Sequence, residues 1–181
     1  MTRTDSPILF LMVGYPGSGK TTVSRMICDM TGAVHLWADH IRNQRFPNPT
    51  HSHEENLALY GALNQEAEDL LAAGNSVVYD TNFNFYKDRK KLKIIAAKAG
   101  ARTVVIWMTT PKAVAKERAT QHGGAGGTRV WAAMPEDRFE QIASHLEPPT
   151  PDEQPICFNG TTLGAETVAT VLREKGLAPE A

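Results

Sequence analysis

Short apolar runs alternate along this chain with stretches in which apolar residues recur every three or four positions. The apolar runs, each of which predicts a strand, occupy residues 7–13, 33–38, 76–80, 103–108 and 156–158. The periodic stretches predict helices at residues 19–30, 52–74, 87–99 and 135–146, with further helices starting near residues 39 and 110 and around residues 168–172. Strands that alternate with helices indicate an α/β fold with a largely parallel sheet.

Two of these helix starts carry capping signals. Ser52 and Glu55 have the spacing of a capping box, in which the acid folds back onto the start of its own helix. Thr110 and Pro111 suit the N-cap and first-turn positions of the helix that follows them.

The composition is that of one globular domain, which we place at residues 1–181. The 181 residues are 41% hydrophobic and 22% charged, a balance typical of folded proteins. The net charge of −1 gives no overall attraction to nucleic acid or to an anionic membrane, although a local basic groove is compatible with it. No apolar run approaches the ~20 residues of a membrane span. Cys28 and Cys157 lack metal-ligand or disulfide-framework spacing, and we interpret them as reduced core thiols of a cytoplasmic protein.

The strongest motif directly follows the first apolar run. "GYPGSGKT" matches the phosphate-binding loop pattern Gly-x4-Gly-Lys-Thr, between a predicted strand and a predicted helix. In this motif backbone N–H groups surround phosphate oxygens, the lysine reaches the β and γ phosphates, and the hydroxyl ligates Mg²⁺. A chance glycine-rich turn is the alternative. The expected nucleotide-binding residues are Gly14, Tyr15, Pro16, Gly17, Ser18, Gly19, Lys20, Thr21 and Thr22.

A candidate acceptor site follows the second predicted strand. Asp39 lies at the carboxyl end of that strand, where ligands bind in open parallel sheets. A carboxylate there can accept the proton of an acceptor hydroxyl during phosphoryl transfer. Arg42 lies one helical turn further on and can bind an anionic acceptor. The alternative is that Asp39 caps the helix and Arg42 is solvated.

A second carboxylate, Asp80, ends the third predicted strand. Carboxylates at this place in phosphate-loop proteins support Mg²⁺ or its waters, so Asp80 is a candidate metal ligand together with Thr21. The polar run "DTNFN" adds Asn82 as a candidate substrate contact. Arg89 either binds a substrate phosphate or belongs to a solvated basic helix face, "KDRKKLK".

The segment "QHGGAGGTR" predicts a lid. It lies between Arg118 and Arg129, and we place the whole lid at about residues 112–146. The two arginines would stabilise charge on the transferring phosphoryl group, and closure would exclude water. The alternative is a disordered surface loop with ordinary arginines. Arg138 is a weaker lid candidate.

Four motifs give the chain a resemblance to a known family. With "GYPGSGKTT", "ADHIR", "VVYDTNFN" and the arginine-bearing segment after "VIWMTTP" in this order, it resembles the small P-loop kinases related to phage polynucleotide kinase, over roughly residues 8–146. The resemblance implies a P-loop NTPase fold of three α/β/α layers, with five parallel strands in the order 2-3-1-4-5 and a helical lid.

The same resemblance implies roles for individual residues. Asp39 would be the general base, Arg42 would contact the acceptor, and Asp80 would lie beside the metal and the phosphates. Arg118 and Arg129 would be lid residues, although the family lid has fewer glycines than this one.

Together these features predict an ATP- and Mg²⁺-dependent kinase that moves the γ-phosphate to an acceptor hydroxyl. The leading candidate for the acceptor is a 5′-hydroxyl polynucleotide end. A small-molecule hydroxyl kinase on the same fold is the alternative, favoured by the near-neutral charge and by the lack of an evident aromatic and basic stripe. A nucleotide-dependent switch ATPase without an acceptor is the third hypothesis. We expect a nucleoside triphosphate and the acceptor as partners, with no membrane and no obligate protein partner. The expected catalytic residues are Lys20, Asp39, Arg42, Arg118 and Arg129.

Overall fold

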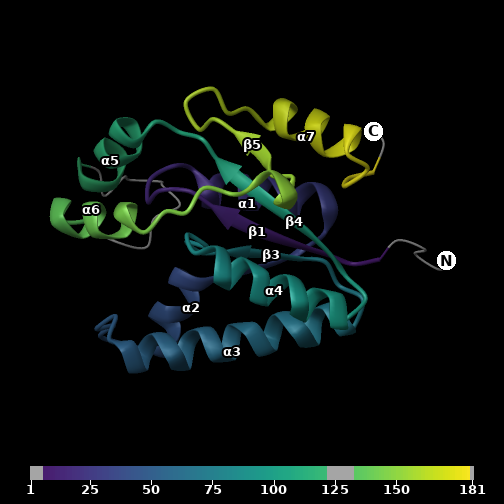
Figure 1. Cartoon of the computed structure of the whole chain (residues 1–181), viewed down its shortest axis with the longest axis horizontal. Coiled ribbons are helices and arrows are strands. Elements are labelled where there is room, and N and C mark those ends of the chain that lie inside the picture. The colour runs from purple at the N-terminus through teal and green to yellow at the C-terminus, as the bar shows by residue number, and fades with distance from the viewer. Residues whose placement is uncertain (1–5, 122–132, 180–181) are drawn as a thin grey trace.

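A parallel sheet forms the centre of the structure, a computed structural model that describes residues 6–121 and 133–179 (Figure 1). Its five strands are β1 (Ile8–Val13), β2 (Val34–Trp37), β3 (Val77–Asp80), β4 (Arg102–Met108) and β5 (Ile156–Phe158). They lie in the order β2-β3-β1-β4-β5, and all four pairings are parallel. The predicted fold class and strand order are therefore confirmed.

Helices cover both faces of this sheet (Figure 1). They are α1 (Lys20–Thr31), α2 (Ala38–Arg45), α3 (His53–Ala72), α4 (Tyr86–Lys98), α5 (Lys112–Gln121), α6 (Glu136–Ser144) and α7 (Ala165–Glu174), with a 3-10 turn at Pro151–Glu153. Helices α3 and α4 pack on one face of the sheet, and α1 and α7 pack on the other. Helices α5 and α6 lie beyond the ends toward which the arrowheads of β1 and β4 point (Figure 1).

Strand β1 shows why the apolar runs have no polar alternation. Leu9 and Leu11 pack with α3 and α4, whereas Phe10 and Met12 pack with α1 and α7. All six residues of the strand are buried, because helices cover both of its faces. A smaller cluster joins α5 to α6 through Ala115, Ala119, Phe139 and Ala143.

The two capping signals are only partly correct. The Ser52 hydroxyl accepts a hydrogen bond from the backbone N–H of Glu55, as an N-cap does. The Glu55 side chain does not return to its own helix start, however, but binds residues outside it. Thr110 does not cap α5. Its hydroxyl instead donates to the carbonyl oxygen of Ser18 at 2.7 Å. In both cases a tertiary partner replaces the local one.

The cysteine prediction is wrong for one of the two residues. Both cysteines are free, and Cys28 is half-buried, but Cys157 is exposed. Strand β5 lies at the sheet edge with an alternating buried, exposed, buried pattern, which directs Cys157 outward. Within the described residues, no helix has the length and apolar character needed to cross a membrane.

Candidate active site

The phosphate-binding loop connects β1 to α1. Gly14 has a φ of +145°, and a side-chain carbon there would lie 2.8 Å from the Ser18 hydroxyl and 2.9 Å from Met108 Cβ. Gly19, at φ +101°, is the residue directly before α1. A side chain at position 14 would fill the turn, so glycine is required for the loop to close in front of the helix N-terminus. Backbone N–H groups at such a terminus bind phosphate oxygens.

Lys20 is folded back onto this loop. Its ammonium group is buried and donates to the carbonyl oxygens of Gly14 at 3.0 Å and Tyr15 at 2.8 Å. Burial lowers the pKa of Lys20 to about 8, and the carboxylates of Asp80 and Asp39 oppose this shift. The two carboxylates therefore do not fully offset the effect of burial on the Lys20 ammonium group. The negative charge of phosphates at the loop would favour this ammonium group, so the arrangement suits a phosphate-binding lysine.

Thr110 and Gly160 support the loop from behind, a contact that sequence reasoning missed. The Thr110 hydroxyl donates to Ser18 and accepts from the backbone N–H of Gly160 at 2.9 Å. A side-chain carbon at Gly160 would lie 2.3 Å from the carbonyl oxygen of Ser18, closer than real contacts allow. The Ser18 hydroxyl is buried without a hydrogen-bond partner among the described residues. An orphaned hydroxyl inside a phosphate-binding turn fits a bound phosphate.

A cavity of about 900 Å³ opens from the phosphate-binding loop toward α6. It lies at the carboxyl ends of β2 and β3, where ligands bind in open parallel sheets. Lys20, Thr21, Asp39 and Asp80 line it together, as the sequence predicts. The opposite wall comes from α5 and α6.

Asp39 faces this cavity from the first turn of α2. The helix begins at Ala38, and its N-cap residue is Trp37, which makes no side-chain capping bond. The alternative interpretation of Asp39 as an N-cap is therefore wrong. The surrounding protein and the nearby Asp80 carboxylate raise the pKa of Asp39, while Lys20 and the other cations nearby lower it. A carboxylate with a raised pKa is a better proton acceptor than an ordinary aspartate.

Arg42 lines the same cavity but is not solvated. It is 3% exposed and forms an ion pair with Glu55. Its second terminal nitrogen donates to the Asn56 side-chain oxygen at 2.7 Å. The Nε atom is buried with no partner in the part of the chain that the structure describes. The structure thus excludes the solvated alternative for Arg42 and leaves its Nε without a hydrogen-bond partner among the described residues.

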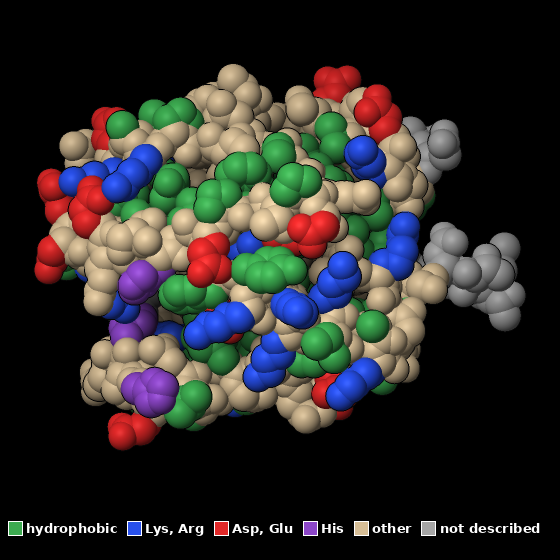
Figure 2. Space-filling view, viewed as in Figure 1, with side chains coloured by type: hydrophobic (Ala, Val, Ile, Leu, Met, Phe, Trp, Pro, Cys, Tyr) green, Lys and Arg blue, Asp and Glu red, His purple; other side chains and the backbone are tan. Residues whose placement is uncertain are grey.

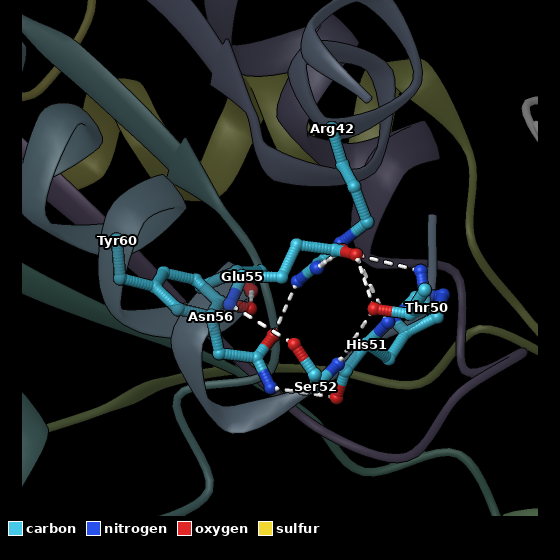
Figure 3. A network of polar contacts seen from close by, with 8 residues as sticks. Arg42, Thr50, His51, Ser52, Glu55, Asn56 and Tyr60 are labelled. Carbon is cyan, nitrogen blue, oxygen red and sulfur yellow. Dashed lines mark hydrogen bonds and ion pairs between the residues drawn. The ribbon is translucent and has the colours of Figure 1, made fainter. Parts of the chain in front are cut away.

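Glu55 links Arg42 to the loop before α3 (Figure 3). Its other carboxylate oxygen accepts hydrogen bonds from the Thr50 backbone at 2.6 Å, the Thr50 hydroxyl at 2.9 Å and the His51 backbone at 3.2 Å. Burial alone would raise the pKa of Glu55, but the hydrogen bonds from Thr50 and Arg42 lower this pKa to about 2. Asn56 also donates to the His51 carbonyl oxygen at 3.1 Å. The network holds His51, a residue that lines the cavity, at a φ of +55°.

Asp80 is held by a histidine of the neighbouring strand. His35 Nε2 lies 3.0 Å from one carboxylate oxygen of Asp80, which is 3% exposed. The His35 ring stacks on Trp37 at 5.8 Å, and Trp37 stacks in turn on His40 at 5.2 Å. The guanidinium of Arg25 also lies over Trp37, at 5.2 Å. Trp37 is thus packed among other planar groups, and the stack fixes the orientation of His35.

Arg89 is a correction to the sequence prediction. It is 2% exposed, and two of its nitrogens donate to Glu153 at 2.7 and 2.9 Å. A third donates to the carbonyl oxygens of Phe83 at 2.9 Å and Glu147 at 3.2 Å. Arg89 does not line the cavity, so it neither binds substrate there nor lies on a solvated face. Its role is to hold the connector after α6 against α4.

Two asparagines of the segment after β3 reach the cavity. Asn82 lines it and is exposed, as expected of a substrate contact. Asn84 also lines it, and its amide nitrogen donates to the Ile142 carbonyl oxygen at 3.4 Å. The Asn84 side-chain oxygen is buried without a partner within the described residues. Because that oxygen needs a donor, Asn84 is a candidate ligand contact that sequence reasoning did not single out.

The arginines of the predicted lid divide into three cases. Arg118 lines the cavity from α5 and donates to the Gly160 carbonyl oxygen at 3.1 Å, close to the phosphate-binding loop. Arg138 lines the cavity from α6 and donates to Gln141 at 2.8 Å. Arg129 lies outside the described residues.

The donor set also fits Mg²⁺ beside bound phosphates. The Thr21 hydroxyl and the Asp80 carboxylate, both oxygen ligands, line the same cavity. Within residues 6–121 and 133–179 there is no cluster of three or more His, Cys, Asp or Glu side chains that would hold a metal on its own. A site of this kind suits Mg²⁺, which is usually bound by one or two protein groups together with substrate phosphates.

Solved structures with the same fold include kinases and an RNA repair complex. A sugar kinase from Janibacter sp. HTCC2649 is 20% identical over 97% of both chains, with a TM-score of 0.68. The APS kinase CysC from Mycobacterium tuberculosis, in complex with AMPPNP and APS, is 16% identical over 94% of this chain and 98% of its own, with a TM-score of 0.63. The Pnkp1/Rnl/Hen1 RNA repair complex is 19% identical over 80% of this chain and 45% of the other, with a TM-score of 0.64.

The sequence comparisons identify one family. No curated protein matches the chain. The model of one family, described as an AAA domain, matches residues 9–149, from the second residue of β1 to beyond α6. That match covers most of the chain and includes both the phosphate-binding loop and the acidic side of the cavity, and the protein therefore belongs to the AAA domain family.

Proposed function

We propose that the protein transfers the γ-phosphate of ATP to the hydroxyl group of an acceptor. One observation carries this proposal: the ammonium group of Lys20 and the carboxylates of Asp39 and Asp80 line one cavity, where Asp80 helps to raise the pKa of Asp39 and both carboxylates act on the pKa of Lys20. A phosphate-binding loop alone serves switches and motors as well as kinases. A carboxylate with a raised pKa on the far side of the phosphates is what an acceptor hydroxyl needs.

Each residue has a defined part in the transfer. The phosphate-binding loop and Lys20 hold the phosphates, and Arg118 neutralises charge that develops on the transferring group. Asp39 takes the proton of the acceptor hydroxyl while the oxygen–phosphorus bond to the acceptor forms. The bond from the γ-phosphorus to the bridging oxygen breaks, and ADP leaves. Mg²⁺, held by Thr21 and Asp80, would neutralise phosphate charge when bound.

Helices α5 and α6 form the lid in this proposal. They carry Arg118 and Arg138 on the cavity wall opposite Asp39 and Asp80. Closure over the substrates would exclude water, which a kinase needs in order to transfer the phosphate to its acceptor rather than to hydrolyse ATP.

Two acceptor classes remain candidates. The 5′-hydroxyl end of a polynucleotide is the leading one, supported by the motif order "DHIR" and "YDTNFN" and by the fold likeness to the RNA repair complex. A small polyhydroxy compound is the second, supported by the neutral amide groups of Asn56, Asn84 and Gln141 on the cavity wall. The sugar kinase structure has the same fold.

The proposal is tested by ADP formation and by acceptor labelling with radioactive ATP. Wild-type protein should label a 5′-hydroxyl oligonucleotide, or else members of a panel of sugars and polyols. Asp39→Asn should lower transfer by about 10²–10⁴-fold, the usual contribution of a general base, with ATP affinity nearly intact. Lys20→Ala should impair nucleotide use itself. Wild-type turnover by Asp39→Asn, or an absence of label on any hydroxyl compound, would contradict the proposal.

A further inference from the structure

The exposed face of α4 is a surface of lysines. Figure 2 shows Lys and Arg side chains gathered over this helix, on the side of the molecule seen in Figure 1. Arg89, Leu92 and Ala96 point inward and are buried. The exposed lysines of the helix, which we call the lysine face, are Lys87, Lys90, Lys91, Lys93 and Lys98.

The lysine face carries positive charge that is not paired. None of its ammonium groups forms an ion pair with a carboxylate in the described part of the chain. The helix itself holds a single acid, Asp88. Two carboxylates from beyond α6 lie nearby: Asp152 is near Lys93, and Glu147 accepts a hydrogen bond from the Tyr86 backbone N–H at 2.6 Å. From Lys87 to Lys98 the surface runs ~17 Å along the helix, at 1.5 Å per residue. An unpaired positive surface of this length attracts a polyanion.

Aromatic rings connect the lysine face to the cavity. Phe85 directly precedes α4 and lines the cavity, and its ring lies 5.4 Å from that of His145. The ammonium group of Lys87 lies 5.3 Å from the centre of the Phe85 ring. Tyr86, the first residue of the helix, is 37% exposed. A ring on the cavity wall, an exposed ring next to it in sequence and lysines along the helix are the combination that single-stranded nucleic acids bind, through base stacking and phosphate contacts.

We propose that the lysine face of α4, with Phe85 and Tyr86 at its start, is the docking surface for a single-stranded nucleic acid whose 5′ end enters the cavity. This inference rests on the proposed function and adds a strand-binding surface to it. The 5′-terminal residue lies in the cavity near Asp39, the next bases stack on the rings, and the following phosphates lie along the lysines. The near-neutral net charge of the chain is compatible with this arrangement because the positive charge is local.

The test compares a long and a short acceptor. The long one is a single-stranded DNA dodecamer with a 5′-hydroxyl group and a fluorescent 3′ tag, and the short one is a nucleoside 3′-monophosphate. Lys90→Gln/Lys91→Gln removes two charges from side chains that make no ion pair, so the fold should be unaffected. The matched control is Arg173→Gln/Lys175→Gln at the end of α7, on the opposite face of the sheet. Anisotropy at several salt concentrations measures dodecamer binding, and phosphate transfer gives KM and kcat for both acceptors.

The α4 variant should bind the dodecamer on the order of tenfold more weakly, and the slope of log affinity against log salt should fall by about 1.4, or 0.7 for each phosphate that no longer meets a lysine. Its KM for the dodecamer should rise, while its KM for the nucleoside 3′-monophosphate and its kcat stay unchanged. The α7 variant should behave as wild type. An unchanged salt slope, an equal rise in KM for both acceptors, or no dodecamer binding by wild type would overturn the docking surface. Salt-dependent binding that the α4 variant loses, without label on either acceptor or on the panel of sugars and polyols, would support the surface and contradict the proposed function.

Discussion

Glu55 is the ion-pair partner of Arg42, and both side chains are almost fully buried beside the cavity. Each carboxylate oxygen of Glu55 serves a different element: one binds the arginine of α2, and the other binds the backbone before α3. The pair therefore fixes the distance between the helix that carries Asp39 and the loop that carries His51. We expect it to shape the acceptor side of the cavity and to leave the nucleotide side unaffected.

Glu55→Ala should test this division. It leaves Arg42 buried without its counter-ion, a change that typically costs about 3–5 kcal/mol of folding stability. At temperatures where the variant is folded, the acceptor KM should rise, whereas the ATP KM should stay close to wild type. Thermal denaturation and steady-state kinetics measure the two effects.

Glu54→Ala is the matched control, because Glu54 is an exposed acid of the same helix turn. Its unfolding and kinetics should stay near wild type. A Glu55→Ala protein with wild-type stability, or with a changed ATP KM and an unchanged acceptor KM, would contradict the role given to this pair.

The parts of the site that the sequence predicts are those determined by a local motif or by a general rule of sheet topology. The phosphate-binding loop is one continuous motif between a strand and a helix, so Lys20 and Thr21 follow from spacing alone. Asp39 and Asp80 follow from a topological rule, since the carboxyl ends of parallel strands meet at one edge. A continuous apolar run for β1 likewise predicts a strand covered on both faces.

The parts that the sequence misses depend on partners far along the chain. Arg89 pairs with a carboxylate 64 residues later, and the Thr110 hydroxyl binds a carbonyl 92 residues earlier. Neither partner can be read from a local pattern, so Arg89 looks like a substrate ligand and Thr110 like an N-cap. For Glu55 a correct local signal hides the tertiary role, because the capping-box spacing accounts for the acid without Arg42.

Nucleotide binding should depend on pH through Lys20. Its pKa in the folded protein is about 8, below the ordinary value of 10.5, because burial disfavours the ammonium form. Phosphates favour that form, so nucleotide binding should raise the pKa and take up a proton above pH 8. ATP affinity should consequently fall as the pH rises through about 8. Calorimetry in buffers of different ionisation enthalpy measures the proton uptake.

Lys20→Arg separates this effect from titration of the nucleotide or of other residues. A guanidinium stays protonated throughout this range, so any residual nucleotide binding by the variant should show no proton uptake near pH 8. Equal proton uptake by the two proteins would assign the titration to a group other than Lys20.

The charged form of Asp39 should lower the stability of the folded protein, because its pKa is raised by its position beside the cavity. Its pKa is raised, so the charged carboxylate is less stable in the folded protein than in the unfolded chain. At neutral pH, Asp39→Asn should therefore have a higher melting temperature than wild type, although we expect its phosphate transfer to be slower. This advantage should shrink as the pH falls through the raised pKa toward the ordinary value of 3.8. A melting temperature that falls at neutral pH would show that Asp39 is held by stabilising contacts instead.

Gly160 should be required for nucleotide binding although it belongs to no recognised motif. A side-chain carbon there would lie 2.3 Å from the Ser18 carbonyl oxygen and 2.6 Å from the Thr110 hydroxyl. Because the first of these neighbours is backbone of the phosphate-binding loop, Gly160→Ala must displace either that loop or the segment after β5. We expect a loss of about 1–3 kcal/mol in stability, as for overpacking elsewhere, and weaker ATP binding.

Gly61→Ala is the control, since Gly61 lies in α3 with open space around it, and alanine there should stabilise the helix by roughly 0.5–1 kcal/mol. Opposite shifts in melting temperature, with ATP affinity lowered only by the change at position 160, would establish that the segment after β5 supports the phosphate-binding loop, and equal ATP affinities would refute it.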